Sequence, residues 1–110
     1  MSTDRLAQLQ ALLAEEPGDV FLRYAIALEL RRLERMDEAM MHLEDLLTDH
    51  PEHVPSHHQL ALMFASLGRI HEAVEAAKAG ALQALVQDDR KARSELLELV
   101  AGLTDEDDGP

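Results

Sequence analysis

The sequence contains no cysteine and no tryptophan, and its aromatic residues are two phenylalanines and one tyrosine. Without cysteine, disulfides and thiolate metal sites are excluded. Aromatic and β-branched residues are too scarce to build a β-sheet. No stretch approaches the roughly 20 apolar residues that a membrane-spanning helix requires. Residues 1–13 include charged side chains and lack the long apolar run of a secretory signal. We therefore expect a soluble, cytoplasmic protein without a membrane partner.

Positive charge is also scarce. The 110 residues include 10 basic and 22 acidic side chains, which gives a formal net charge of −12 with histidine neutral. A negative field repels phosphate backbones, so nucleic acid is not an expected partner. A chain of this length is expected to form one domain.

The apolar residues that are abundant, leucine and alanine, favour helices over strands. Proline, glycine and acidic turn residues divide the chain into segments of helical length, and apolar residues recur every three or four positions within them. The predicted helices span residues 3–15, 20–34, 37–49, 55–67, 70–86 and 89–102. Asp19 is expected to cap the second helix. The short connections require neighbouring helices to run antiparallel.

The chain repeats itself at a spacing of 34 residues. When residues 20–51 are aligned with residues 54–85, seven of the 32 pairs are identical. Residues 5–17 align in the same way with residues 39–51. A two-helix hairpin cannot bury its apolar faces alone, so such repeats stack, with small residues where helices cross closely. The residues predicted to occupy these crossings are Ala27, Ala39, Ala61 and Ala73.

These repeats resemble the tetratricopeptide repeat family. The matching positions are the four crossing alanines, the turn glycine Gly68 and the closing prolines Pro17 and Pro51. The sequence departs from the family pattern at Glu34, which replaces the turn glycine of the first repeat, and at Leu85, which replaces the closing proline of the second. The resemblance implies an all-α, right-handed superhelical array of antiparallel helix hairpins, with about six helices.

The predicted domain covers residues 1–103 and is followed by a frayed acidic tail at residues 104–110. Its parts are a half repeat at 3–17, a first repeat at 20–51, a second repeat at 54–87 and a capping helix at 89–102. The capping helix is expected to cover an apolar face of the fifth helix made by Val74, Ala77, Ala81 and Leu85.

The resemblance also implies a function, because family members bind peptides or protein segments in a concave groove lined by the first helix of each repeat. The matched groove positions are Phe21, Tyr24, Leu28, Arg31, His58, Leu62 and Ala65. We expect a protein-interaction module or adaptor, not an enzyme, with a peptide or protein partner and no cofactor. The alternative is self-association as a homodimer through the groove or the open end, because two full repeats are few for a stable array.

Four histidines, His50, His53, His57 and His58, gather near the middle of the chain. His53 and His57 have the one-turn spacing that can bind a metal. Pro55 interrupts that turn, and no third ligand is evident. A metal-binding protein is therefore a remote alternative, and no metal ligand or catalytic residue is predicted.

Overall fold

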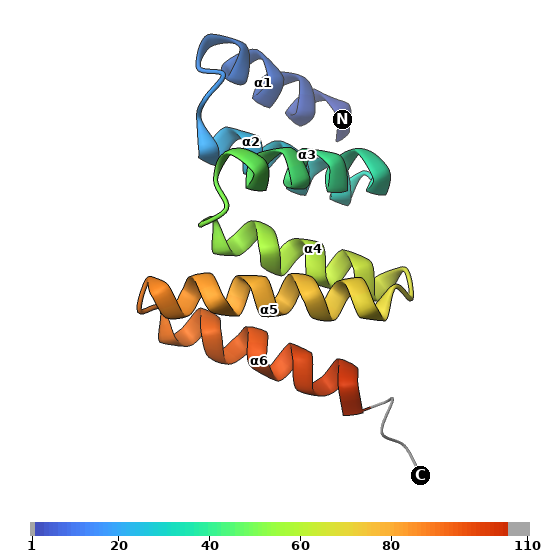
Figure 1. The fold of residues 1–110 in the computed structure, drawn as a ribbon. Helices are drawn as coiled ribbons and strands as arrows, with labels where there is room; N and C mark the ends of the chain where they lie inside the picture. Colours follow the sequence, from blue (N-terminus) through green and yellow to red (C-terminus); the bar gives the residue numbers. More distant parts are fainter. Residues whose placement is uncertain (1, 106–110) are drawn as a thin grey trace. The chain divides into compact units, whose positions relative to one another are not determined.

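The computed structural model describes residues 2–105, and these residues form six α-helices (Figure 1). The helices are α1 (Ser2–Glu15), α2 (Val20–Arg32), α3 (Met36–Asp49), α4 (Val54–Ser66), α5 (Ile70–Val86) and α6 (Arg90–Asp105). The predicted all-α class is confirmed. Two helices end at clearly different residues from those predicted. The helix α2 ends at Arg32, before Glu34, and α6 continues to Asp105, so two residues expected in the tail are helical. The predicted tail otherwise lies outside the described residues.

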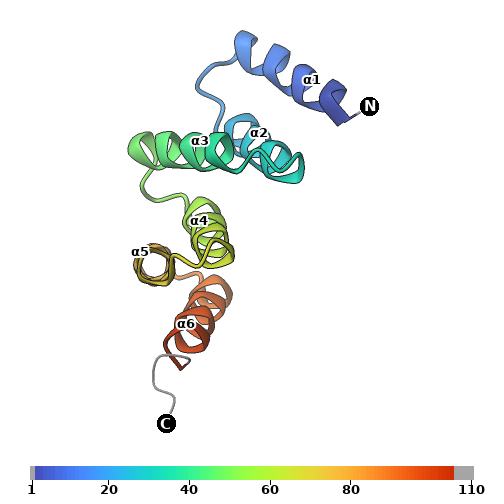
Figure 2. The same ribbon diagram turned by 90° about the vertical axis from the view of Figure 1, so that its right-hand side faces the viewer.

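The chain divides into two compact units, one ending at Asp49 and the other beginning at His50. Within the first unit, α2 packs against both α1 and α3 (Figures 1 and 2). Within the second unit, α5 packs against both α4 and α6. In the second unit α4 and α6 also touch each other, over a smaller contact. The arrangement of the repeats as one domain stays a prediction.

Three turns close their helices in the same way. A residue with positive φ follows α2, α4 and α5, namely Glu34 (φ 63°), Gly68 (φ 76°) and Asp88 (φ 57°). In each turn the next N–H donates to the carbonyl five residues earlier: Arg35 to Leu30 and Arg69 to Phe64, both at 2.9 Å, and Asp89 to Ala84 at 2.8 Å. This is the Schellman closure of a helix. The left-handed conformation of Glu34 explains why α2 ends earlier than predicted.

The start of α2 also follows the prediction. A carboxylate oxygen of Asp19 accepts a hydrogen bond of 2.9 Å from the backbone N–H of Leu22. This bond satisfies one of the N–H groups that have no partner in the first turn of a helix.

Alanines occupy the buried helix crossings in both units. Ala27, Ala39, Ala61 and Ala73 are all buried, as the 34-residue spacing predicts. The core of the second unit contains Val54, Ala61, Ala77, Ala81, Ala84 and Leu96, with Ala92, Leu99 and Val100 packed against it. The prediction that α6 covers Leu85 is wrong, because 56% of that residue is exposed. Leu85 lies beside the alanine face of α5 that α6 does cover.

Gly80 lies at a close approach of α5 to α4 and α6. A Cβ atom at this position would lie 2.8 Å from Cβ of His57 in α4 and 3.1 Å from Cδ1 of Leu96 in α6. The residue 34 positions earlier is Leu46, which is fully buried in α3. The second repeat has therefore replaced a large core residue by glycine, and α5 approaches its neighbours closely at this point.

Candidate functional site

A hollow of about 320 Å³ lies along α2 on the side of α1, and we call it the α2 hollow. Its lining residues are Arg5 of α1 and Phe21, Tyr24, Ala25, Leu28, Glu29 and Arg32 of α2. Three of the predicted site residues, Phe21, Tyr24 and Leu28, thus come together in one unit. Phe21 is 76% exposed, so a large aromatic surface faces solvent at the edge of the hollow.

The helical period of α2 explains this placement. Ile26 and Leu30 are buried and form the stripe of α2 that belongs to the core. Phe21, Tyr24 and Leu28 follow one another at spacings of three and four, so they share a second stripe. The core of this unit uses the stripe of Ile26 and Leu30, so the stripe of Phe21, Tyr24 and Leu28 can make contacts outside that core.

A buried carboxylate gives the α2 hollow its charge. Glu29 is buried, and its two oxygens accept hydrogen bonds from Nε of Arg32, at 3.0 Å, and from Nη2 of the same side chain. Nε of Arg5 lies 3.6 Å from Oε1 of Glu29. The hydrogen bonds from Arg32 lower the pKa of Glu29, and the charges of Arg32 and Arg5 act in the same direction. Two guanidinium groups thus lie against one carboxylate.

This charged cluster was not predicted from the sequence. Glu29 and Arg32 have the spacing of an ordinary surface ion pair. The position of Glu29 carries a signal, however, because its counterpart 34 residues later is Met63, which is fully buried. A carboxylate at a core position requires charged partners.

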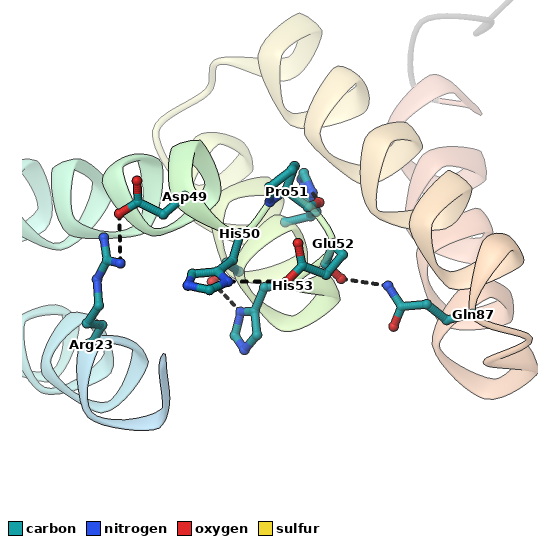
Figure 3. A network of polar contacts seen from close by, with 9 residues as sticks. Arg23, Asp49, His50, Pro51, Glu52, His53 and Gln87 are labelled. Atoms are coloured by element: carbon teal, nitrogen blue, oxygen red, sulfur yellow. Dashed lines mark hydrogen bonds and ion pairs between the residues drawn. The ribbon is translucent and has the colours of Figure 1, made fainter. Parts of the chain in front are cut away.

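The other predicted residue of α2, Arg31, is half-buried and is not among the residues that line the α2 hollow. A neighbouring arginine, Arg23, forms an ion pair of 2.8 Å with Asp49 at the end of α3 (Figure 3). This pair links α2 to α3 in the first unit.

The predicted residues of the second repeat lie on α4. His58, Leu62 and Ala65 are all half-buried, and their spacings of four and three place them on one stripe of the helix. They belong to the second compact unit, whereas the α2 hollow belongs to the first. That the two sets form one groove stays a prediction.

The histidines of the central cluster make local bonds (Figure 3). The bonds join Nδ1 of His50 to Glu52 at 3.3 Å, Nδ1 of His53 to Oγ of Ser56 at 2.7 Å, and Nε2 of His57 to the carbonyl of Pro51 at 2.8 Å. Ser56 is fully buried, so its hydroxyl cannot reach a substrate. Burial lowers the pKa of His53. Among the described side chains, no group of three or more histidine, aspartate or glutamate residues is placed to hold a metal ion.

A larger hollow, of about 640 Å³, lies between α5 and α6, and we call it the α5–α6 hollow. Its lining residues are Ala84, Leu85, Asp88, Asp89, Arg90, Arg93, Ser94, Leu97, Glu98 and Ala101. Leu85 and Leu97 are 56% and 42% exposed. Sequence reasoning missed this surface, because it assigned Leu85 to the covered face of α5. Gln87 at the end of α5 donates a 2.6 Å hydrogen bond to the carbonyl of Glu52, which fixes the end of α5 (Figure 3).

None of the helices in the described part of the chain combines the length and the apolar character needed to cross a bilayer.

No protein-family model matches the sequence, and no curated protein is significantly similar to it. Solved structures do match. The chain is similar to a tetratricopeptide repeat domain protein from Salinibacter ruber, with a TM-score of 0.76, 26% identity, and coverage of 79% of this chain and 88% of the other. It is also similar to a protein from Bordetella parapertussis, with a TM-score of 0.81, 24% identity, and coverage of 93% and 89%. A third match is MamA from Desulfovibrio magneticus RS-1, with a TM-score of 0.62, 16% identity, and coverage of 98% and 69%. The second and third likenesses concern the fold alone.

Proposed function

We propose, on the premise that this chain is a tetratricopeptide-like helical repeat protein, that it binds a segment of another polypeptide along the α2 hollow. The observation that carries the proposal is the second apolar stripe of α2, in which Phe21 is exposed and Tyr24 and Leu28 are half-buried. Phe21 at 76% exposure, with Tyr24 and Leu28, offers rigid contact area on a helix whose core stripe is already filled. Aromatic side chains in such positions contribute strongly to protein–protein affinity.

The charge of the hollow indicates the chemistry of the segment. Arg5 and Arg32 both lie against the carboxylate of Glu29, so an incoming carboxylate would meet two guanidinium groups. Arg5 is the more exposed of the two arginines. The fitting segment therefore carries an apolar side chain for the Phe21 stripe and an acidic residue beside it. In the second unit, His58 and Leu62 of α4 are the residues 34 positions after Tyr24 and Leu28.

The proposal involves no catalysis. The hydroxyl that is paired with His53 is buried, and the α2 hollow offers contact area and charge and no activated nucleophile.

A peptide-display selection against the full chain tests the proposal. We expect the selected peptides to share an apolar residue next to an aspartate or glutamate, and to lose at least tenfold in affinity for Phe21→Ser. Arg5→Ala should weaken acidic peptides more than their amide analogues. Met41→Ser is the matched control, since Met41 is 53% exposed on α3 and lies away from the α2 hollow. Peptides that bind Phe21→Ser and wild type equally would refute the proposed surface.

A further inference from the structure

Exposed leucine and valine side chains gather in the second unit, on a surface that the peptide proposal does not use. Leu82, Leu85 and Val86 of α5 are 58%, 56% and 73% exposed, and Leu97 of α6 is 42% exposed. Leu82 precedes Leu85 and Val86 by three and four residues, so the three share one face of α5. Leu85 and Leu97 both line the α5–α6 hollow. We call these four residues the α5–α6 patch.

The position of Leu97 shows what distinguishes α6 from the two earlier helices of its type. When residues are counted from the start of each helix, buried Leu96 of α6 has the same position as buried Ile26 of α2 and Leu60 of α4. Leu97 then has the position of the crossing alanines Ala27 and Ala61. Those alanines are buried where the following helix crosses, whereas no helix follows α6 within the described residues. Among the described residues the equivalent surface of α6 is exposed, as the 42% exposure of Leu97 shows.

A leucine at this position also limits what can cover the surface. In the complete repeats an alanine lets the next helix approach closely, and a larger side chain would overpack such a contact. A further repeat hairpin in the usual geometry would meet the larger side chain of Leu97. The occupant must instead pack at a greater distance and place apolar side chains of its own in the hollow of about 640 Å³.

The charges around the hollow favour a second copy of the same chain. Its rim carries three carboxylates and two guanidinium groups: Asp88, Asp89, Glu98, Arg90 and Arg93. This is one net negative charge, in a chain whose net charge is −12. Arg90 and Asp88 lie 3.8 Å apart as an ion pair, and both side chains are almost fully exposed, so the pair can exchange partners with a second copy. In a two-fold contact each rim arginine can face a carboxylate of the other copy, as isologous interfaces require.

We propose that this protein forms a symmetric dimer in which the α5–α6 patches of two copies pack together, with Leu85 and Leu97 of each copy entering the hollow of the other. The contact buries apolar side chains that are otherwise exposed to water. This inference does not depend on peptide binding by the α2 hollow, because the two surfaces share no residue.

Sedimentation velocity over a range of concentrations, with full-length protein, tests the proposal. Wild type is expected to shift from monomer to dimer with rising concentration. Val86→Glu should weaken the dimer at least about a hundredfold, because it removes an apolar contact and places a carboxylate of each copy in the interface. Met41→Glu adds the same charge at a residue of similar kind, 53% exposed on α3, and should leave the dimer unchanged. Circular dichroism checks that both variants are folded.

A wild-type protein that stays monomeric up to several hundred micromolar would overturn the proposal. So would a dimer that persists in Val86→Glu, or one that Met41→Glu or Phe21→Ser dissociates equally. The peptide affinity of Val86→Glu is measured separately and should equal that of wild type, so a failure of the dimer is distinguishable from a failure of the α2 surface.

Discussion

Replacing Gly80 by alanine should destabilise the protein, although alanine is the better helix former. The added Cβ would lie 2.8 Å from Cβ of His57 and 3.1 Å from Cδ1 of Leu96. The leucine methyl is the end of a flexible side chain and can turn away. The Cβ of His57 is attached directly to the backbone of α4, and the ring is also fixed by a 2.8 Å hydrogen bond from Nε2 to the carbonyl of Pro51. Relief therefore requires that α4 and α5 move apart.

Two opposing terms set the size of the effect. Glycine in a helix is less stable than alanine by about 0.5–1 kcal/mol. Overpacking a close contact costs about 1–3 kcal/mol. The net loss for Gly80→Ala is therefore on the order of 1–2 kcal/mol. Gly102→Ala in α6 is the matched control, since nothing lies within 4 Å of the Cβ that it would add. The control should gain about 0.5 kcal/mol.

Urea unfolding followed by circular dichroism at 222 nm measures both variants. Opposite signs of the change in unfolding free energy are expected, with Gly80→Ala below wild type and Gly102→Ala above it. If the two variants are stabilised equally, the close approach of α4, α5 and α6 at Gly80 is wrong, and with it the packing described for the second unit.

Substitutions in the turns, at the helix crossings and in the central histidine cluster should also change stability. Glu34→Gly should stabilise the fold by about 1 kcal/mol, because glycine adopts a φ of 63° without strain; Gly68→Ala should cost a similar amount, and thermal unfolding of the pair checks both signs. Ala39→Leu and Ala73→Leu should each cost about 1–3 kcal/mol, and unfolding midpoints equal to wild type would contradict the crossings. Burial lowers the pKa of His53 from its ordinary 6.5, so below that pH the unfolded chain binds the proton more readily. Stability therefore falls as the pH is lowered through 6.5, and His53→Gln should reduce that slope in urea titrations between pH 5.5 and 7.5.

Much of the fold follows from short-range patterns. The 34-residue spacing identified the buried alanines, and the spacing of three and four within helices separated the core stripe of α2 from the stripe of Phe21, Tyr24 and Leu28. The end of α2 was harder to predict from the sequence, because it depends on the left-handed conformation of Glu34, which the hydrogen bonds of the Schellman closure hold in place. The residue type at position 34 gives no sign of this.

Features that depend on contacts between elements were harder to predict. The burial of Glu29 becomes evident only when the ion pairs from Arg5 and Arg32 are known. The exposure of Leu85 depends on which face of α5 the closing helix covers, and α6 covers the alanine face. Neither fact follows from helical periodicity. Periodicity determines which residues share a face of a helix, but it does not determine which other helix packs against that face.

The most direct test of the central claim is a titration of the ¹⁵N-labelled chain with a selected apolar and acidic peptide, followed by two-dimensional NMR. We expect the largest shift changes on α2 between Phe21 and Arg32 and on Arg5, and we expect them to vanish in Phe21→Ser while the remaining spectrum is preserved. Shift changes confined to α5 and α6, or equal changes in Phe21→Ser, would show that the α2 hollow is not where this protein holds its partner.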